Sequence, residues 1–299
     1  MPELVHLTPT DAAYPARLRA LDPPPSTVAV QGGPLEASRA IAVVGSRAAS
    51  PGAAVFAHEL AATLADAGAV IVSGGAEGID AAAHQGALEA KGRTWAVAGT
   101  GHGRCFPDAH ATLFETIARG PGAMVWPFPD GYHGRSGFLA RNRVLVALAD
   151  AVVVVQAGLP SGALHAASWA RKLNRPLWVV PAAPWLDEFA GSRQLLATGA
   201  RMLLAPEQLA RALLLTVPAV ARTPQAHVPG RVLSGSESAV LEATSSVACH
   251  ADEIAARARL TAQAAAVTLL TLALEDVVVE GPPGFFRRTN ASQTMKISG

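Results

Sequence analysis

Short, almost entirely apolar runs alternate with helical segments between residues 40 and 205 of this chain. Strands of this kind are typical of a parallel sheet covered on both faces, because neither side of such a strand meets water. The alanine-rich segments between the runs predict helices that connect the strands by right-handed crossovers. The sequence therefore predicts an α/β fold with a doubly wound, mostly parallel, Rossmann-like sheet. The predicted strands are AIAVVG (40–45), AVIVSGG (69–75), TWAVAG (94–99), AMVWPF (123–128), AVVVVQ (151–156) and PLWVVP (176–181).

The rest of the chain differs in composition from this alternating region. Proline, glycine and serine without periodicity indicate a linker after it. Three helical segments and two strands around a Gly-Pro turn then predict a small winged-helix domain. The expected division is a lead-in segment with one short strand (1–38), a Rossmann-like domain (39–215), a linker (216–235), a winged-helix domain (236–290) and a tail (291–299).

Bulk properties favour a cytoplasmic protein. The chain has 299 residues and only two cysteines, Cys105 and Cys249, which are too few for a disulfide framework. Its first residues lack the basic end and apolar run of a signal peptide. Its longest aliphatic stretch, residues 151–155, is far shorter than the roughly 20 residues that span a bilayer. We therefore expect no membrane partner.

Glycine- and serine-rich turns follow several of the predicted strands. In doubly wound sheets, ligands bind beyond the carboxyl ends of the strands. The helix N-termini that begin there attract anions, and Ser50, Asp80 and Ser161 stand where N-cap residues belong. Arginines at the start of a helix are unfavourable for the helix dipole, so a bound anion would explain the cluster at 141–143. We expect an anion-binding rim formed by Gly45, Ser46, Arg47, Gly74, Gly75, Gly78, Arg141, Asn142, Arg143, Ser161 and Gly162.

The motifs of common cofactor sites and catalytic sites do not occur in this sequence. No G-x-G-x-x-G follows a strand, and no acidic residue closes the next strand to hold a ribose. Neither a G-x-x-x-x-G-K-[ST] loop nor a G-x-S-x-G elbow is present. We therefore expect no cofactor and no metal.

Charge separates the two predicted domains. Residues 39–211 carry a net charge of +3, and residues 236–290 carry −3. A DNA-reading winged helix needs cations on its third helix to offset phosphate charge. The segment TAQAAAVTLLTLALED (261–276) has no cation and ends in two acids. We therefore expect this domain to be an interaction or regulatory module rather than a DNA reader. Arg287 and Arg288 on the predicted wing are the argument for DNA reading.

With these residues in view, the chain resembles the DprA family, also called Smf, of bacterial DNA-processing proteins. The resemblance covers roughly residues 14–290. The motifs that carry it occur in the family's order: YPARL, VVGSRAAS, SGGAEGIDAAAHQGAL, AVAGTG, FLARNRVLVALAD and SGALHAASWARKLNRPLWVVP. It implies an extended Rossmann domain that binds single-stranded DNA, protects incoming DNA, forms a homodimer and loads RecA in natural transformation and recombination. It also implies that the protein is not an enzyme.

Carried over to this sequence, the family's DNA-gripping positions fall on the rim residues already named, and we add Lys172 to them. Two departures stand out. Glu77 occupies a position where the family usually has arginine or lysine, and a carboxylate there opposes phosphate binding. The N-terminal helical SAM-like domain of many members is expected to be missing from this chain. Whether double-stranded DNA also binds weakly is left open by the sequence.

Alternative functions remain at this point. Nucleotide phosphoribohydrolases of the LOG type share the Rossmann core, but their motif supplies a catalytic glutamate, and GLPSGALHAASWA (158–170) contains no acid. A winged-helix transcription factor is disfavoured by the acidic third helix. Two weaker expectations complete the analysis: a dimer interface near an apolar helix at 192–215, and modest base stacking by Phe106, Tyr132 and Phe138.

Overall fold

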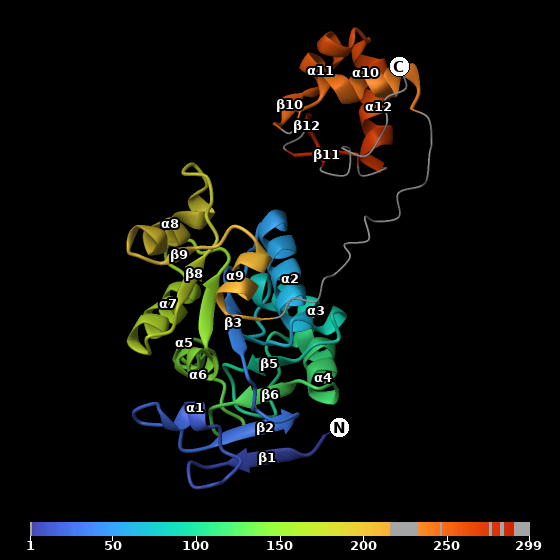
Figure 1. The fold of residues 1–299 in the computed structure, drawn as a ribbon. Coiled ribbons are helices and arrows are strands. Elements are labelled where there is room, and N and C mark those ends of the chain that lie inside the picture. The colour runs from blue at the N-terminus through green and yellow to red at the C-terminus, as the bar shows by residue number, and fades with distance from the viewer. Residues whose placement is uncertain (1, 216–232, 246, 275–276, 282–283, 290–299) are drawn as a thin grey trace. The chain divides into compact units, whose positions relative to one another are not determined.

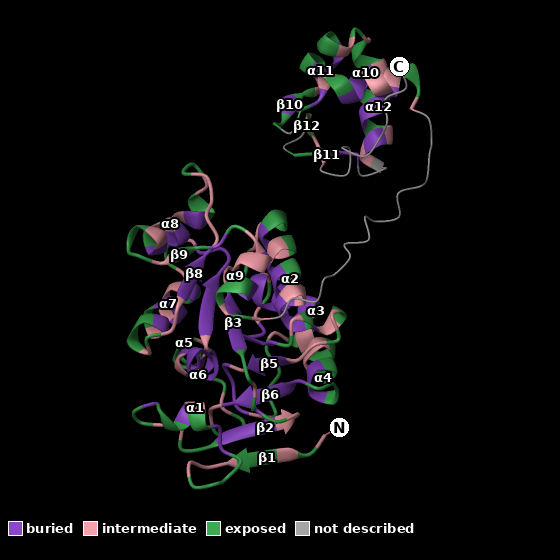
Figure 2. Cartoon of the chain, viewed as in Figure 1, coloured by how far each residue is buried: buried purple, intermediate pink, exposed green. Residues whose placement is uncertain are grey.

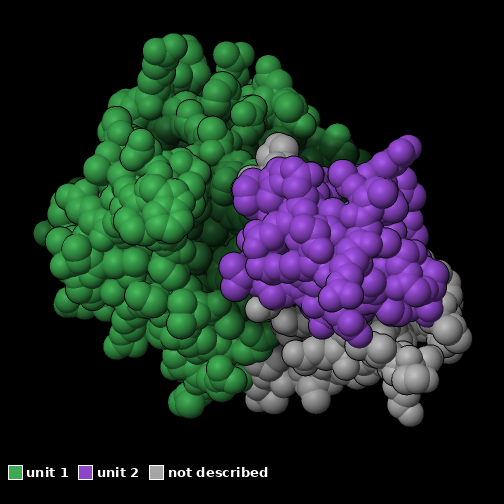
Figure 3. Space-filling view, turned by 90° about the horizontal axis from the view of Figure 1, so that it is seen from above, with its two compact units in different colours: residues 1–219 green, residues 220–299 purple. Residues whose placement is uncertain are grey.

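The computed structural model of this protein describes residues 2–215, 233–245, 247–274, 277–281 and 284–289. The chain forms two compact units, residues 1–219 and 220–299, which Figure 3 colours separately. Each unit has hydrophobic clusters of its own. Most of the predicted linker, residues 216–232, and the whole predicted tail, 291–299, lie outside the described residues.

A nine-stranded sheet, counted over the described residues, forms the centre of the first unit (Figure 1). Its strands lie in the order β1-β2-β6-β5-β4-β3-β7-β8-β9. Neighbours from β6 to β9 are parallel, whereas β2 is antiparallel to both β1 and β6. The strands are β1 (Leu4–Leu7), β2 (Val28–Gly32), β3 (Ala40–Val44), β4 (Val70–Ser73), β5 (Thr94–Val97), β6 (Ala123–Trp126), β7 (Ala151–Val154), β8 (Leu177–Val179) and β9 (Arg201–Met202).

The central strands are buried on both faces, as their apolar sequences predict (Figure 2). In β3, Ile41 and Val43 pack into the hydrophobic cluster on one face of the sheet. Ala42 and Val44 pack into the cluster on the other face. Because consecutive side chains of a strand point to opposite faces, such a strand has no position for a solvated side chain.

Helices cover both faces of this sheet (Figure 1). Helices α1, α6 and α7 contribute to one hydrophobic cluster, and α2, α3 and α9 contribute to the cluster on the opposite face. The helices of this unit are α1 (Ala16–Arg19), α2 (Pro51–Asp66), α3 (Ile79–Glu89), α4 (Ala111–Arg119), α5 (Gly137–Ala140), α6 (Asn142–Leu148), α7 (Gly162–Lys172), α8 (Ala190–Ala197) and α9 (Pro206–Ala212), with 3-10 turns at Asp108–His110 and Asp187–Phe189. The doubly wound, mostly parallel α/β fold is confirmed.

All six strands predicted between residues 40 and 181 are present, as is the short strand of the lead-in segment. The sequence analysis missed β1 and β9. It was wrong about the single helix at 192–215, which the structure divides into α8, β9 and α9. Gly199, with φ of +92°, lies at the first of these breaks, in a conformation that glycine adopts without steric cost.

The motif FLARNRVLVALAD also differs from its prediction. It forms two short helices, α5 and α6, with Arg141 between them, rather than one helix. Val144, Leu145 and Leu148 are buried, but Leu139 is 49% exposed and lies outside the core. The exposed leucine belongs to α5, which ends before the buried face of α6 begins.

The second unit contains three helices and a three-stranded sheet within its described residues. Ser234 begins the first helix with a capping box, in which its hydroxyl accepts from the Glu237 amide and the Glu237 carboxylate accepts from the Ser234 amide. The elements are α10 (Gly235–Ala243), β10 (Cys249–His250), α11 (Ala251–Ala258), α12 (Ala262–Leu274), β11 (Val278–Glu280) and β12 (Phe285–Arg288). Across the described ranges of both units, no helix is long and apolar enough to cross a membrane.

Candidate nucleic-acid interface

The sheet changes winding direction between β3 and β7, which are parallel neighbours. The chain proceeds from β3 through β4 and β5 to β6 on one side, and through β7 and β8 to β9 on the other. The loops that follow β3 and β7 therefore leave the same edge of the sheet in opposite directions. Ligands of doubly wound folds bind in the crevice that such a divergence creates.

Backbone hydrogen bonds join these two loops. The Ser46 amide donates to the Gln156 carbonyl at 2.8 Å. The Ser50 amide donates to the side-chain oxygen of Gln156, also at 2.8 Å. Since Gln156 lies two residues beyond the end of β7, the loop after β7 holds the turn after β3 in place. The side chains of Ser46 and Arg47 are left at the surface of the edge.

The glycine turn after β4 packs directly beneath the first turn. Gly78 has φ of +74°, and a Cβ atom there would lie 2.4 Å from the Ser46 carbonyl oxygen. The Ile79 amide donates to the same oxygen at 3.1 Å. Only glycine allows this approach, so Gly78 supports the rim from below. The expectation that Asp80 caps the helix was wrong: Gly78 is at the N-cap, and Asp80 lies inside the first turn of α3.

Arg141 is buried and satisfied by the protein itself. Its Nη1 donates to the Val97 carbonyl at 2.8 Å, and its Nη2 lies 3.5 Å from the Asp80 carboxylate. Burial raises the pKa of Asp80, and the Arg141 guanidinium opposes that rise. A Cβ at Gly74 would lie 1.6 Å from Nη1, so Gly74 provides the space for this guanidinium. Arg141 therefore stabilises the loops of the rim rather than presenting a free charge.

The loop after β7 completes the edge. The Ser161 hydroxyl caps α7 by accepting from the Ala163 amide at 3.2 Å, as predicted. The buried Asn142 side chain donates to the Gly162 carbonyl at 3.1 Å. This bond attaches the start of α6 to the start of α7. The motifs FLARNRVLVALAD and SGALHAASWARKLNRPLWVVP therefore meet at this point.

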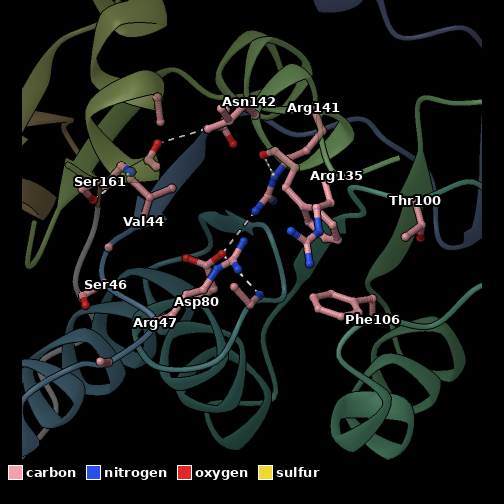
Figure 4. Close-up of a pocket in the computed structure, with 18 of the residues that line it drawn as sticks. Val44, Ser46, Arg47, Asp80, Thr100, Phe106, Arg135, Arg141, Asn142 and Ser161 are labelled. Atoms are coloured by element: carbon pink, nitrogen blue, oxygen red, sulfur yellow. Dashed lines mark hydrogen bonds and ion pairs between the residues drawn. The ribbon is translucent and has the colours of Figure 1, made fainter. Parts of the chain in front are cut away.

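A cleft of about 1010 Å³ opens between these loops. Figure 4 shows Ser46 and Ser161 on one side of it, Thr100 and Phe106 on the other, and Arg141 between them. Within the described part of the chain, no hydrogen bond or ion pair engages the guanidinium groups of Arg47, Arg104 and Arg135, all exposed and all lining the cleft.

Aromatic side chains accompany the cations in the cleft. Phe106 is 52% exposed, and its ring centroid lies 4.9 Å from that of Phe138. The Arg47 guanidinium lies over the Phe138 ring at 5.5 Å. Tyr132, the third residue expected to stack on bases, instead stacks on Phe128 and does not line the cleft.

Most residues predicted for the rim meet at this cleft, but two cations do not. Arg143 donates to the Pro23 carbonyl of the lead-in segment, and Lys172 lies over the Trp169 ring at the far end of α7. Gly74 lines a smaller adjoining cavity of about 90 Å³, and Gly75 packs against Phe114. The predicted residues that line the cleft are Gly45, Ser46, Arg47, Arg141, Asn142, Ser161 and Gly162.

The sequence analysis missed two of the three free arginines. Arg104 follows the AVAGTG motif, which ends just after β5, and Arg135 lies in GYHGRSG, immediately before the FLARN motif. A signal was therefore present, since both are lone arginines in glycine-rich loops beside recognised motifs. Their convergence depends on how those loops fold back over the edge of the sheet.

The exposed guanidinium groups of the cleft are suited to binding anions. Burial, and then the charge of Asp108, raise the pKa of the Cys105 thiol, which disfavours the nucleophilic thiolate. Among the described residues, no group of three or more His, Cys, Asp or Glu side chains is arranged to hold a metal ion. Guanidinium forks without protein partners suit phosphate oxygens, which they bind in pairs of hydrogen bonds.

A doubly wound α/β unit with free arginines and the rings of Phe106 and Phe138 beside its switch point defines a Rossmann-type protein with an arginine-lined cleft. Residues 5–214 match the family model of DNA recombination-mediator protein A, and residues 224–284 match that of the DprA winged helix domain. The chain belongs to the DprA/Smf family. The predicted fold class, with its C-terminal winged helix, is thereby confirmed.

Individual relatives agree with this assignment. A DNA processing protein DprA from Mycobacterium tuberculosis is 44% identical over 56% of this chain and 43% of its own length. The structure of DNA processing protein A from Helicobacter pylori, described for its single-stranded DNA binding mode, gives a TM-score of 0.65 at 29% identity and covers 71% of this chain and 96% of that one. DprA from Streptococcus pneumoniae gives a TM-score of 0.66 at 29% identity, covering 70% and 74%. The chain spans about half the length of the curated relatives it matches.

Proposed function

We propose that this chain binds single-stranded DNA in the cleft at the switch point, with Arg47, Arg104 and Arg135 contacting phosphates. The observation that carries the proposal is the convergence of three exposed guanidinium groups that have no hydrogen-bond or ion-pair partner among the described residues. Phe106 and Phe138 offer rings on which bases can stack. The single-stranded DNA binding of the Helicobacter pylori relative supports the same ligand.

Membership of the DprA/Smf family supports a wider role. We propose that the protein acts in the cytoplasm as a non-enzymatic homodimer that protects incoming DNA and loads RecA onto it during natural transformation. The proposed domain division is a Rossmann-like domain at 39–215, a linker at 216–235 and a winged helix at 236–290. The exposed face of α12 includes Gln263, Val267 and Leu270 and carries no cation, so the winged helix does not read DNA through this helix.

Salt dependence of binding tests the central claim. Fluorescence anisotropy with a labelled 20-mer of deoxythymidine, titrated from 50 to 300 mM NaCl, measures how many phosphates the protein neutralises. For single strands, log K changes with log salt by about −0.7 per phosphate neutralised, so three arginines predict a slope of about −2. Binding that does not respond to salt would contradict the proposal.

Matched variants locate the contact. Arg47→Ala should lower affinity about 10-fold and reduce the slope by about 0.7. Lys172→Ala is the control, because this lysine lies over Trp169 outside the cleft. Equal losses in both variants would show that total charge, not the cleft, determines binding. Parallel incubation with nucleoside monophosphates tests the LOG-type alternative, since release of free base would show a hydrolase.

The assembly claims need separate measurements. Sedimentation velocity tests the homodimer, and the rate of RecA filament formation on strands coated with single-strand-binding protein tests RecA loading. We expect this protein to accelerate filament formation and Arg47→Ala to abolish the acceleration. A wild-type protein that binds the strand but leaves filament formation unchanged would exclude RecA loading while leaving DNA binding intact.

A further inference from the structure

A second cavity lies beside the cleft at the same edge of the sheet. Its volume is about 450 Å³, within the roughly 300–1,000 Å³ of pockets that hold small organic molecules. Its floor comes from β6, through Met124 and Trp126, and one wall comes from α4, through Phe114. The cavity is separate from the loops after β3 and β7, and none of the residues predicted for the anion-binding rim lines it.

The two hollows share one wall. Thr100, Arg104, Cys105 and Phe106 line both the cleft and this cavity. Arg104, a free guanidinium of the cleft, therefore also lies at the cavity, beside the exposed ring of Phe106. A phosphate held by Arg104 is consequently within one nucleotide's reach of either hollow.

The lining of the second cavity suits a flat aromatic ring. Trp126 is only 7% exposed, and His102 approaches its ring edge-on with the centroids 5.1 Å apart. Phe114 is packed against Gly75 on one side and meets His110 edge-on at 6.0 Å on another, so its position is constrained. The acid at the cavity, Glu115, is already paired with Arg119 at 2.7 Å, which leaves Arg104 as the dominant charge.

We propose that this cavity, hereafter the Trp126 cavity, is a second subsite of the DNA site and accepts one nucleobase of a strand whose phosphate is held by Arg104. The inference rests on the proposed function, because it needs a strand in the cleft. Rings of Phe114 and Trp126 provide the apolar surfaces against which a base packs. Base packing of this kind is tolerant of sequence, since every base has an aromatic face.

Strands with and without bases distinguish this role from phosphate binding. Anisotropy is measured for labelled deoxythymidine 12-mer and for an abasic 12-mer with the same sugar–phosphate backbone. Phe114→Ala should lower affinity for the thymidine strand about 10-fold, which is the low end of measured base–aromatic contributions, and leave the abasic strand unchanged. The salt slope should stay the same for both, because no cation is removed.

A matched control is Phe56→Ala, since Phe56 is a half-buried phenylalanine of α2 that packs against the hydrophobic cluster formed by α2, α3 and α9 and lines neither hollow. Equal losses on the two strands in Phe114→Ala, or no loss on either, would overturn the subsite. Wild-type protein that binds neither strand would instead overturn the proposed function. If the wild-type protein binds both strands with a steep salt slope, and Phe114→Ala binds them with the same affinities, only the subsite is contradicted and the proposed function stands.

A measurement on the unaltered protein guards against a variant that fails to fold. Strands carrying 5-iodouracil are photocrosslinked, and the modified peptide is identified by mass spectrometry. Crosslinks at Phe114 or Trp126 support the subsite, and crosslinks confined to Phe106 and Phe138 exclude it. Free thymidine monophosphate serves as a separate arm. If Phe114→Ala weakens binding of thymidine monophosphate but leaves the affinity for the strand unchanged, the cavity is a mononucleotide site and the strand assignment is wrong.

Discussion

Arg141 and Asp80 form an ion pair with 3.5 Å between Nη2 and the carboxylate, and their side chains are only 8% and 6% exposed. The pair joins the short turn between α5 and α6 to the first turn of α3. Residues 61 positions apart in the chain are thereby fixed at one edge of the sheet. One of the arginines that the sequence predicts as a DNA contact therefore organises the loops of the site.

Removal of the Arg141 charge should destabilise the protein strongly. Arg141→Met leaves the Asp80 carboxylate buried without a cation, which typically costs about 3–5 kcal/mol. The double variant Asp80→Leu/Arg141→Met should recover part of that loss, because it removes the unpaired charge as well. Urea denaturation measures both effects, and a loss below about 1 kcal/mol in Arg141→Met would contradict the structural role.

Gly74→Ala should be destabilising by a similar amount. The added methyl group would lie 1.6 Å from Nη1 of Arg141, so it forces the guanidinium away from Asp80 at a cost of about 3 kcal/mol. Gly52→Ala is the control, since a Cβ at this position in α2 meets nothing within 4 Å. Thermal denaturation should show a large drop for the first variant, and for the second a change within about 1 kcal/mol of wild type.

Arg104→Ala and Arg135→Ala should each weaken single-strand binding and reduce the salt slope by about 0.7. The reason is that both guanidinium groups are exposed at the cleft without a protein partner in the described structure. Arg143→Ala should leave the slope unchanged, because that side chain is bound to the Pro23 carbonyl. Salt titration of the three variants checks the assignment; an unchanged slope in both cleft variants would refute it.

Glu77→Gln should strengthen binding about two- to five-fold at low salt. Glu77 is exposed and lines the small cavity of about 90 Å³ together with Arg47, so its charge opposes a phosphate there. Glu59→Gln, an exposed position of α2 outside the cleft lining, controls for net charge. Anisotropy at 50 and 300 mM NaCl should show the gain shrinking as salt screens the carboxylate.

His84 should make the stability of the protein sensitive to acid. Burial, and then the charge of Arg141, lower the pKa of His84 to about 3, whereas an unfolded histidine has a pKa of about 6.5. Between these values the unfolded state binds the extra proton, so stability falls with decreasing pH by up to about 1.4 kcal/mol per unit. Urea denaturation from pH 7 to 5 gives the slope of the unfolding free energy against pH. The difference in this slope between wild type and His84→Gln isolates the contribution of His84. The exposed His133→Gln should behave like wild type.

Much of this protein could be predicted from local patterns. Apolar runs identified every strand from β3 to β8, because a strand buried on both faces leaves no position for a polar side chain. The glycine turns after β3 and β4 were recognisable for a similar reason. Gly45 and Gly78 lie where another backbone or side chain comes too close for a Cβ, and the β–turn–helix pattern shows where such approaches occur.

Which cations are free to bind a ligand was decided only by the tertiary structure. Arg135, Arg141 and Arg143 lie within nine residues, yet one faces the cleft, one is buried against Asp80 and one is bound to the lead-in segment. Lys172 stands at the far end of an 11-residue helix, which at about 1.5 Å per residue carries it well away from the Ser161 turn. Sequence determined the strands and turns because short-range packing restricts residue type there. The direction of a long charged side chain depends on partners far away in the chain, and these come together only when the protein folds.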